Sequence, residues 1–130
     1  MAVVFLFPDV MPMALILIAE DDESMRRVLA RALSEAGHRV RAVGDGIEAA
    51  ERLAEDDFDL LLADVVMPGM DGIELARRAA ADHPELRIMF ITGFAAVALR
   101  HRDVTNRARV LSKPFHLRDL VAEVERMLAA

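Results

Sequence analysis

Short apolar runs that end abruptly in polar or turn-forming residues constrain the fold of this chain more than any other feature. One such run, Phe58–Ala63, stops at the carboxylate of Asp64 and is followed by the turn-rich segment Val65–Gly72. A short apolar run bounded by proline and glycine is typical of a buried β-strand. Similar runs occur at Ala14–Ala19, Leu86–Ile91 and Arg109–Leu111. The sequence therefore predicts several short, buried strands.

Stretches with helical periodicity lie between these runs. Apolar residues recur at helical spacing between Asp22 and Ala36, and Gly37 supplies a stop. The segment Asp103–Arg107 is polar and lacks a period, so no helix is expected there. A less regular strand is predicted over His38–Val43. Gly44–Gly46 is a predicted turn, and the second helix follows it to about Glu55. The other predicted helices span approximately Asp22–Ala36, Asp71–Asp82, Ala95–Arg100 and His116–Leu128.

Five strands alternating with five helices predict an α/β fold in which helices cover both faces of a parallel sheet. Right-handed crossovers then give a doubly wound, five-stranded sheet. The strand order 2-1-3-4-5 places the first and third strands side by side. The carboxyl ends of these strands share one edge of the sheet, so we expect Glu20 and Asp21 to lie close to Asp64. The pattern predicts one domain over residues 14–130.

Residues 1–13 fall outside the alternating pattern. The segment is apolar, but Pro8, Asp9 and Pro12 interrupt it and no basic residue precedes it, which argues against a signal peptide. We interpret residues 1–13 as a dispensable N-terminal extension, and Met13 could itself begin the chain.

Charge and composition exclude several classes of function. The net charge is −6, which argues against direct binding of nucleic acid because such binding needs a basic surface. The chain has no cysteine, which excludes disulfides, thiol catalysis and thiolate metal sites. No apolar run approaches the ~20 residues of a membrane span. We expect a cytoplasmic protein.

The polar residues at the strand ends predict a site for a divalent cation and a phosphoryl group. Three neighbouring carboxylates (Glu20, Asp21 and Asp64) repel one another unless a cation lies between them, and hard oxygen ligands favour Mg²⁺. Asp64 could then act as a nucleophile towards phosphorus. Lys113 would neutralise phosphoryl charge, and the hydroxyl of Thr92 could donate to a phosphoryl oxygen.

The arrangement resembles the receiver domain of two-component response regulators over Ala14–Ala129. The residues that carry the resemblance are Glu20–Asp21, Asp64 with Met67–Gly72, Thr92–Gly93 and Lys113–Phe115. The resemblance implies a flavodoxin-like receiver fold and phosphorylation of Asp64 by a histidine kinase or histidine phosphotransferase.

The same resemblance implies a role for each site residue. Mg²⁺ would be held by Asp21, Asp64 and the backbone carbonyl of Val66, with Glu20 acting through water. Thr92 would read the phosphate and Lys113 would contact it. The effect of phosphorylation would appear on the face made by the fourth helix, the fifth strand and the fifth helix. One residue departs from the pattern, because many receivers carry an aromatic switch residue where this chain has Val110.

A narrower resemblance involves Ile91–Leu99 and Val110–Val121, which look like the CpdR-type single-domain regulators of alphaproteobacteria. That resemblance implies input from a cell-cycle phosphorelay and, in the unphosphorylated state, an adaptor role for the ClpXP protease. The predicted function is a stand-alone phosphorylation-dependent switch of protein contacts. We therefore expect the protein to catalyse only its own phosphorylation and dephosphorylation, and not the turnover of a separate substrate.

Two alternative functions remain open from the residues alone. A Mg²⁺-dependent phosphatase with an aspartyl nucleophile typically carries a second aspartate two residues later, and Val66 occupies that position. A flavodoxin-like protein could instead bind a flavin phosphate. Its phosphate loop needs hydroxyls and free backbone N–H groups, whereas Glu20–Glu23 would repel a phosphate in the absence of a metal.

Overall fold

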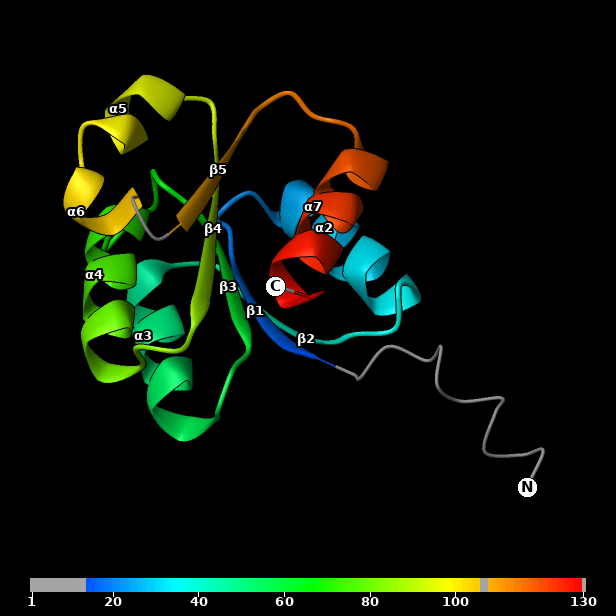
Figure 1. Cartoon of the computed structure of the whole chain (residues 1–130), viewed down its shortest axis with the longest axis horizontal. Helices are drawn as coiled ribbons and strands as arrows, with labels where there is room; N and C mark the ends of the chain where they lie inside the picture. Colours follow the sequence, from blue (N-terminus) through cyan, green and yellow to red (C-terminus); the bar gives the residue numbers. More distant parts are fainter. Residues whose placement is uncertain (1–13, 106–107, 130) are drawn as a thin grey trace.

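The computed structural model describes residues 14–105 and 108–129 (Figure 1). Its five strands form one parallel sheet in the order β2-β1-β3-β4-β5, as predicted. The strands are β1 Leu15–Ala19, β2 Arg39–Val43, β3 Leu60–Asp64, β4 Arg87–Thr92 and β5 Ala108–Ser112.

Helices cover both faces of this sheet. Figure 1 shows α2 and α7 on one face, with α3, α4 and the short pair α5 and α6 on the other. The helices are α2 Glu23–Glu35, α3 Gly46–Glu55, α4 Gly72–Asp82, α5 Ala95–Leu99, α6 Arg102–Thr105 and α7 Leu117–Ala129. No helix in the described part of the chain has the length and apolar content to cross a membrane.

Buried side chains alternate between the two faces of the central strands. Leu17 of β1 and its register partner Leu61 of β3 belong to the core under α3 and α4. Ile16 and its partner Leu60 belong to the opposite core, with Leu29 of α2. Because both faces are covered, these strands are apolar at nearly every position, which explains the continuous runs in the sequence.

Aspartates fix the start of three helices. The side chains of Asp22, Asp45 and Asp71 accept hydrogen bonds from the third backbone N–H that follows, at 3.0, 2.7 and 2.8 Å. Such caps satisfy N–H groups that a helix start leaves without partners. Helix α5 differs, because Phe94 precedes it and provides no side-chain cap.

The prediction for the fourth helix was incomplete. Helix α5 ends at Leu99, and a separate four-residue helix, α6, follows where the polar sequence indicated no helix. The described residues therefore contain six helices and not five. Val104 is buried, and Arg77 Nε lies 3.0 Å from Asp103 Oδ2, which ties α6 to α4. A single helical turn is too short to show a period, so tertiary contacts define it.

The predicted extension, residues 1–13, lies outside the described residues, as do Asn106 and Arg107 of the Asp103–Arg107 segment. The division into an extension and a domain of residues 14–130 remains a prediction. We expect a chain that begins at Met13 to unfold cooperatively, with a midpoint within about 3 °C of the full chain, because it keeps every core residue of the described part of the chain. Circular dichroism during heating measures this. A broad, non-cooperative transition in the shorter chain would show that the segment packs on the domain.

Candidate functional site

Polar residues meet at one edge of the sheet, where strands β1, β3, β4 and β5 end. Carboxylate oxygens of Glu20, Asp21 and Asp64 all lie within 4.8 Å of one another. Asp64 is the last residue of β3, and Glu20 and Asp21 directly follow β1. The adjacency of β1 and β3 in the sheet produces this cluster, in agreement with the expectation from the strand order.

Lys113 lies between two of the three carboxylates. Its Nζ donates to Asp64 Oδ2 at 2.9 Å and to Glu20 Oε1 at 3.0 Å. The backbone N–H of Lys113 donates to the Thr92 carbonyl at 2.8 Å, which continues the pairing of β4 with β5 past the end of the strand. The backbone bond fixes the position of Lys113 at the sheet edge, and the two Nζ contacts show that its ammonium group points into the carboxylate cluster.

Glu20 is wholly buried, which is rare for a carboxylate without partners. Its Oε2 accepts from the backbone N–H of Asp22 at 3.1 Å, and Arg26 holds the backbone carbonyl of Glu20 at 2.9 Å. Burial raises the pKa of Glu20, and the negative charge of Asp64 adds to this, although the hydrogen bonds from Asp22 and Lys113 oppose it.

The ammonium of Lys113 remains firmly protonated. Partial burial lowers its pKa, but the hydrogen bonds to Asp64 and Glu20 outweigh burial, so that the pKa lies above its ordinary value. The site therefore contains three acidic groups and one fixed cation before any ligand arrives.

Asp64 and Asp21 differ in exposure. Asp64 is 7% exposed, and its Oδ1 accepts from the Val66 N–H at 3.2 Å, while Asp21 is exposed. No hydrogen bond or ion pair engages the Asp21 carboxylate in the part of the chain that the structure describes. One carboxylate is thus free to take a ligand from solvent, beside another that is held in place.

Thr92 is buried at the end of β4. Its hydroxyl oxygen accepts from the backbone N–H of Phe94 at 2.8 Å. Across residues 14–105 and 108–129, no hydrogen bond joins this hydroxyl to Asp64 or Lys113. The structure therefore places Thr92 beside the other predicted site residues in the sheet, since Asp64 pairs with Ile91, but it does not link them directly.

Two structural residues of this site were not foreseen. Arg26 looks in the sequence like any other arginine on a helix surface, yet it fixes the loop that carries Glu20. Gly72 was predicted at the end of the turn-rich segment and the start of the following helix, without a packing role. A Cβ atom at Gly72 would lie 2.0 Å from the carbonyl oxygen of Asp64, so α4 can approach β3 only with glycine here.

The donor set fits a magnesium ion. All the side-chain donors are carboxylate oxygens, and the three residues could bring ligand atoms to one point. Mg²⁺ typically takes only one or two carboxylates and completes its shell with water and phosphate oxygens. The free carboxylate of Asp21 and the nearby Asp64 meet that need.

Comparison with known proteins decides between the three predicted functions. The model of the response regulator receiver domain matches residues 16–125. The response regulator receiver protein CpdR of Brucella abortus is 62% identical over 116 residues, which cover 88% of this chain and 97% of that protein.

Two further similarities agree with that match. The sensor kinase CckA of the same species is 36% identical over 88% of this chain but only 12% of its own length. A solved response regulator receiver protein from Sinorhizobium medicae is 30% identical, with a TM-score of 0.83 over 91% of this chain and 96% of that one. The match supports neither the phosphatase nor the flavin interpretation. This chain belongs to the family of response regulator receiver domains, the signalling domains of two-component systems.

Proposed function

We propose that this chain accepts a phosphoryl group on Asp64 from a histidine kinase or histidine phosphotransferase, and that the aspartyl phosphate switches its contacts with other proteins. The observation that carries the proposal is the ammonium of Lys113, held 2.9 Å from the buried Asp64 and beside the exposed Asp21. The high identity to a CpdR protein supports the same function, and with it the ClpXP adaptor role that the narrower resemblance implies.

The chain's own residues divide the work of phosphoryl transfer. A carboxylate oxygen of Asp64 forms the new bond to phosphorus as the bond from phosphorus to the donor's imidazole nitrogen breaks, and the electron pair stays on that nitrogen. Lys113 neutralises phosphoryl oxygens. Mg²⁺, held by Asp21, Asp64 and the carbonyl of Val66 with Glu20 acting through water, would supply further neutralisation. Apart from this transfer and hydrolysis of the aspartyl phosphate, we propose no turnover of a substrate.

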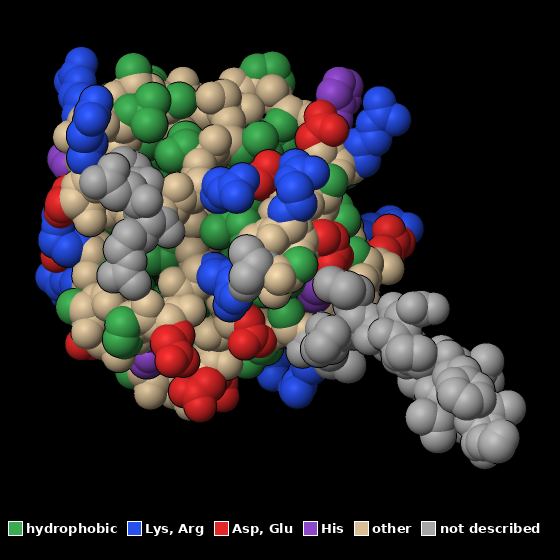
Figure 2. All heavy atoms as spheres, in the orientation of Figure 1, with side chains coloured by type: hydrophobic (Ala, Val, Ile, Leu, Met, Phe, Trp, Pro, Cys, Tyr) green, Lys and Arg blue, Asp and Glu red, His purple; other side chains and the backbone are tan. Residues whose placement is uncertain are grey.

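The face around α5 is suited to respond. Figure 2 shows hydrophobic side chains over α5 at the top of the view. Phe94, Val97 and Leu99 are 58%, 37% and 56% exposed, although they are large apolar side chains. Because the backbone N–H of Phe94 donates to the Thr92 hydroxyl, a phosphate that attracts this hydroxyl would also disturb the start of α5. Val110 is half-buried and stands where many receivers carry a larger aromatic switch residue. Because this chain lacks that aromatic ring, we propose that Phe94 or Leu99 repacks instead.

The direct test is phosphorylation of the full chain by a small phosphodonor such as acetyl phosphate. We expect a mass increase of one phosphoryl group in the presence of Mg²⁺ and none after chelation. A protein that gains no phosphate under conditions that label another receiver domain would overturn the proposal.

Magnesium should stabilise the folded protein. The ion relieves repulsion between Asp21 and Asp64 and binds only the folded state, so at tenfold excess over Kd the gain is about 1.4 kcal/mol, or roughly 4 °C or more in Tm. Asp21→Ala should remove this gain, whereas Asp57→Ala, an exposed aspartate outside the cluster, should keep it. A wild-type Tm indifferent to Mg²⁺ would contradict the metal site.

Thr92→Ala should accept phosphate on Asp64 and yet fail to signal. The variant keeps the carboxylates and loses the hydroxyl that joins the site to Phe94. We expect Lys113→Ala to be uncoupled as well, and to take up phosphate more slowly because it loses the ammonium that neutralises phosphoryl oxygens. Amide hydrogen exchange with and without a beryllofluoride phosphate mimic measures the response, which should be largest over Gly93–Thr105 in the wild type and small in Thr92→Ala. A response concentrated in α2 and α3 would contradict this assignment of the responding face.

A further inference from the structure

We propose that the groove between α3 and α4 is a docking site for a basic, amphipathic helical segment of a partner protein. The groove lies beside the phosphoacceptor site and shares no residue with it. We call it the α3–α4 groove. It is lined by Ile47, Ala50 and Glu51 of α3, by Met70 and Asp71 of the loop between β3 and α4, and by Glu74 of α4.

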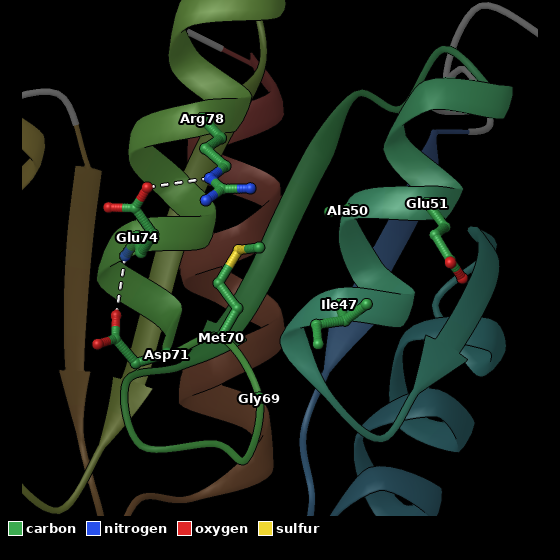
Figure 3. Close-up of a pocket in the computed structure, with 8 residues that line it drawn as sticks. All are labelled: Ile47, Ala50, Glu51, Gly69, Met70, Asp71, Glu74 and Arg78. Atoms are coloured by element: carbon green, nitrogen blue, oxygen red, sulfur yellow. Dashed lines mark hydrogen bonds and ion pairs between the residues drawn. The ribbon is translucent and has the colours of Figure 1, made fainter.

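The floor of the α3–α4 groove is apolar. Ile47 is 51% exposed on α3, and Met70 projects between the two helices in Figure 3. Ala50 contributes a small side chain, so the hollow between α3 and α4 reaches about 680 Å³. That volume has room for several aliphatic side chains, and burying Ile47 beneath them would provide a favourable apolar contact.

The rim of the groove is acidic. The groove and an adjoining hollow are lined by Asp45, Glu48, Glu51, Asp71 and Glu74, against a single guanidinium, that of Arg78. Arg78 is already engaged, because its Nε lies 3.0 Å from Glu74 Oε2 (Figure 3). The side-chain carboxylate of Glu51 has no hydrogen bond or ion pair within the described residues. Glu74 also pairs with Arg77 at 2.8 Å, and Glu48 lies 4.0 Å from Arg52. The net negative charge of the rim therefore rests on Glu51 and on the helix-capping carboxylates of Asp45 and Asp71.

The spread of these charges favours an extended cation over a compact one. Among the described residues, the carboxylates that lie close enough together to share a metal ion are those of Glu20, Asp21 and Asp64. None of the groove's carboxylates belongs to this cluster. One metal ion could not reach the groove's carboxylates together. Lysines or arginines on a helix, which flank leucine-like side chains, match both the apolar floor and the acidic rim. Residues 1–13 carry no basic side chain and do not match this rim.

The experiment uses the full, unphosphorylated chain labelled with ¹⁵N, so its result does not depend on phosphorylation of Asp64. The probe is a helical peptide with leucine on one face and lysine on the other, and the comparator replaces lysine by glutamate. We expect saturable amide shifts centred on Ile47, Glu51 and Met70 with the lysine peptide and none with the glutamate peptide.

Matched variants separate docking from general attraction. Ile47→Ser and Glu51→Lys should each weaken binding at least about fivefold, which corresponds to the loss of one apolar contact or one charge pair. Val28→Ser removes a similarly exposed apolar side chain on α2, and Glu55→Lys makes the same charge change one turn along α3. Both controls should stay within about twofold of the wild type.

Four results would overturn the proposal. These are the absence of saturable binding, equal weakening by the variants and their controls, shifts centred on α5, and occupation of the groove by the chain itself. The last would appear as groove amides that move with protein concentration, which indicates a second copy, or that move in a chain beginning at Met13, which indicates the N-terminal segment.

Discussion

Replacing Asp64 with asparagine should reduce phosphate incorporation from a small phosphodonor to background. Asparagine keeps the shape of the side chain and can still accept the hydrogen bond from the Val66 N–H. It removes the charged oxygen that attacks phosphorus, and an amide is a poor nucleophile. The measurement is intact mass after treatment with acetyl phosphate and Mg²⁺, together with loss of the label in base, as expected for an acyl phosphate.

The control for this variant is Asp57→Asn, which changes an exposed aspartate outside the cluster and should label like the wild type. The fold of Asp64→Asn should survive, because Lys113 keeps its contact with Glu20. Equal labelling of Asp64→Asn and the wild type would place the phosphate elsewhere and remove the basis of the proposed function.

Gly72→Ala should destabilise the protein by about 2–4 kcal/mol. Helix propensity alone predicts the opposite, because alanine in a helix interior is favoured over glycine by up to about 1 kcal/mol. The clash outweighs that gain, since the new Cβ would lie 2.0 Å from the carbonyl oxygen of Asp64, and a backbone atom cannot swing away. Helix α4 must then move away from β3, which also breaks the 2.8 Å bond from the Gly72 N–H to the Val65 carbonyl.

Gly93→Ala provides the matched control, because a Cβ at Gly93 meets nothing within 4 Å. Its Tm should change by no more than about 2 °C. Urea unfolding followed by circular dichroism gives the free energy of unfolding of both variants. A Gly72→Ala protein as stable as the wild type would show that α4 can shift on the sheet without cost, and would weaken the case that Gly72 positions Asp64.

The sequence predicted the sheet well because burial on both faces leaves a simple signature. Strands such as β3 are apolar at every position before Asp64, so their existence, order and polar ends could be predicted. Helix α6 could not be predicted, since one turn held by Val104 and by the Arg77–Asp103 pair has no period to detect.

The site was predictable to the level of strand ends and no further. Topology alone brings Glu20 and Asp64 together. Which atoms meet depends on rotamers and loop geometry, as in the two contacts of Lys113 and the engagement of the Thr92 hydroxyl by Phe94. His38 shows the same limit, because its ring is buried with Nε2 2.9 Å from Glu125 Oε1, a pairing across 87 residues that no local pattern encodes.

Helix α5 has five residues and begins without a side-chain cap, in contrast to the aspartate-capped α2, α3 and α4. A helix that yields readily to a phosphoryl group also yields to thermal motion. Under the proposed function, the unphosphorylated protein therefore visits its signalling conformation unprompted, at a level set by a gap of a few kcal/mol, or about 0.1–10% of molecules. The background noise of the signalling circuit is then a property of this one short helix, and adding a cap at Phe94 would lower the noise and the responsiveness together.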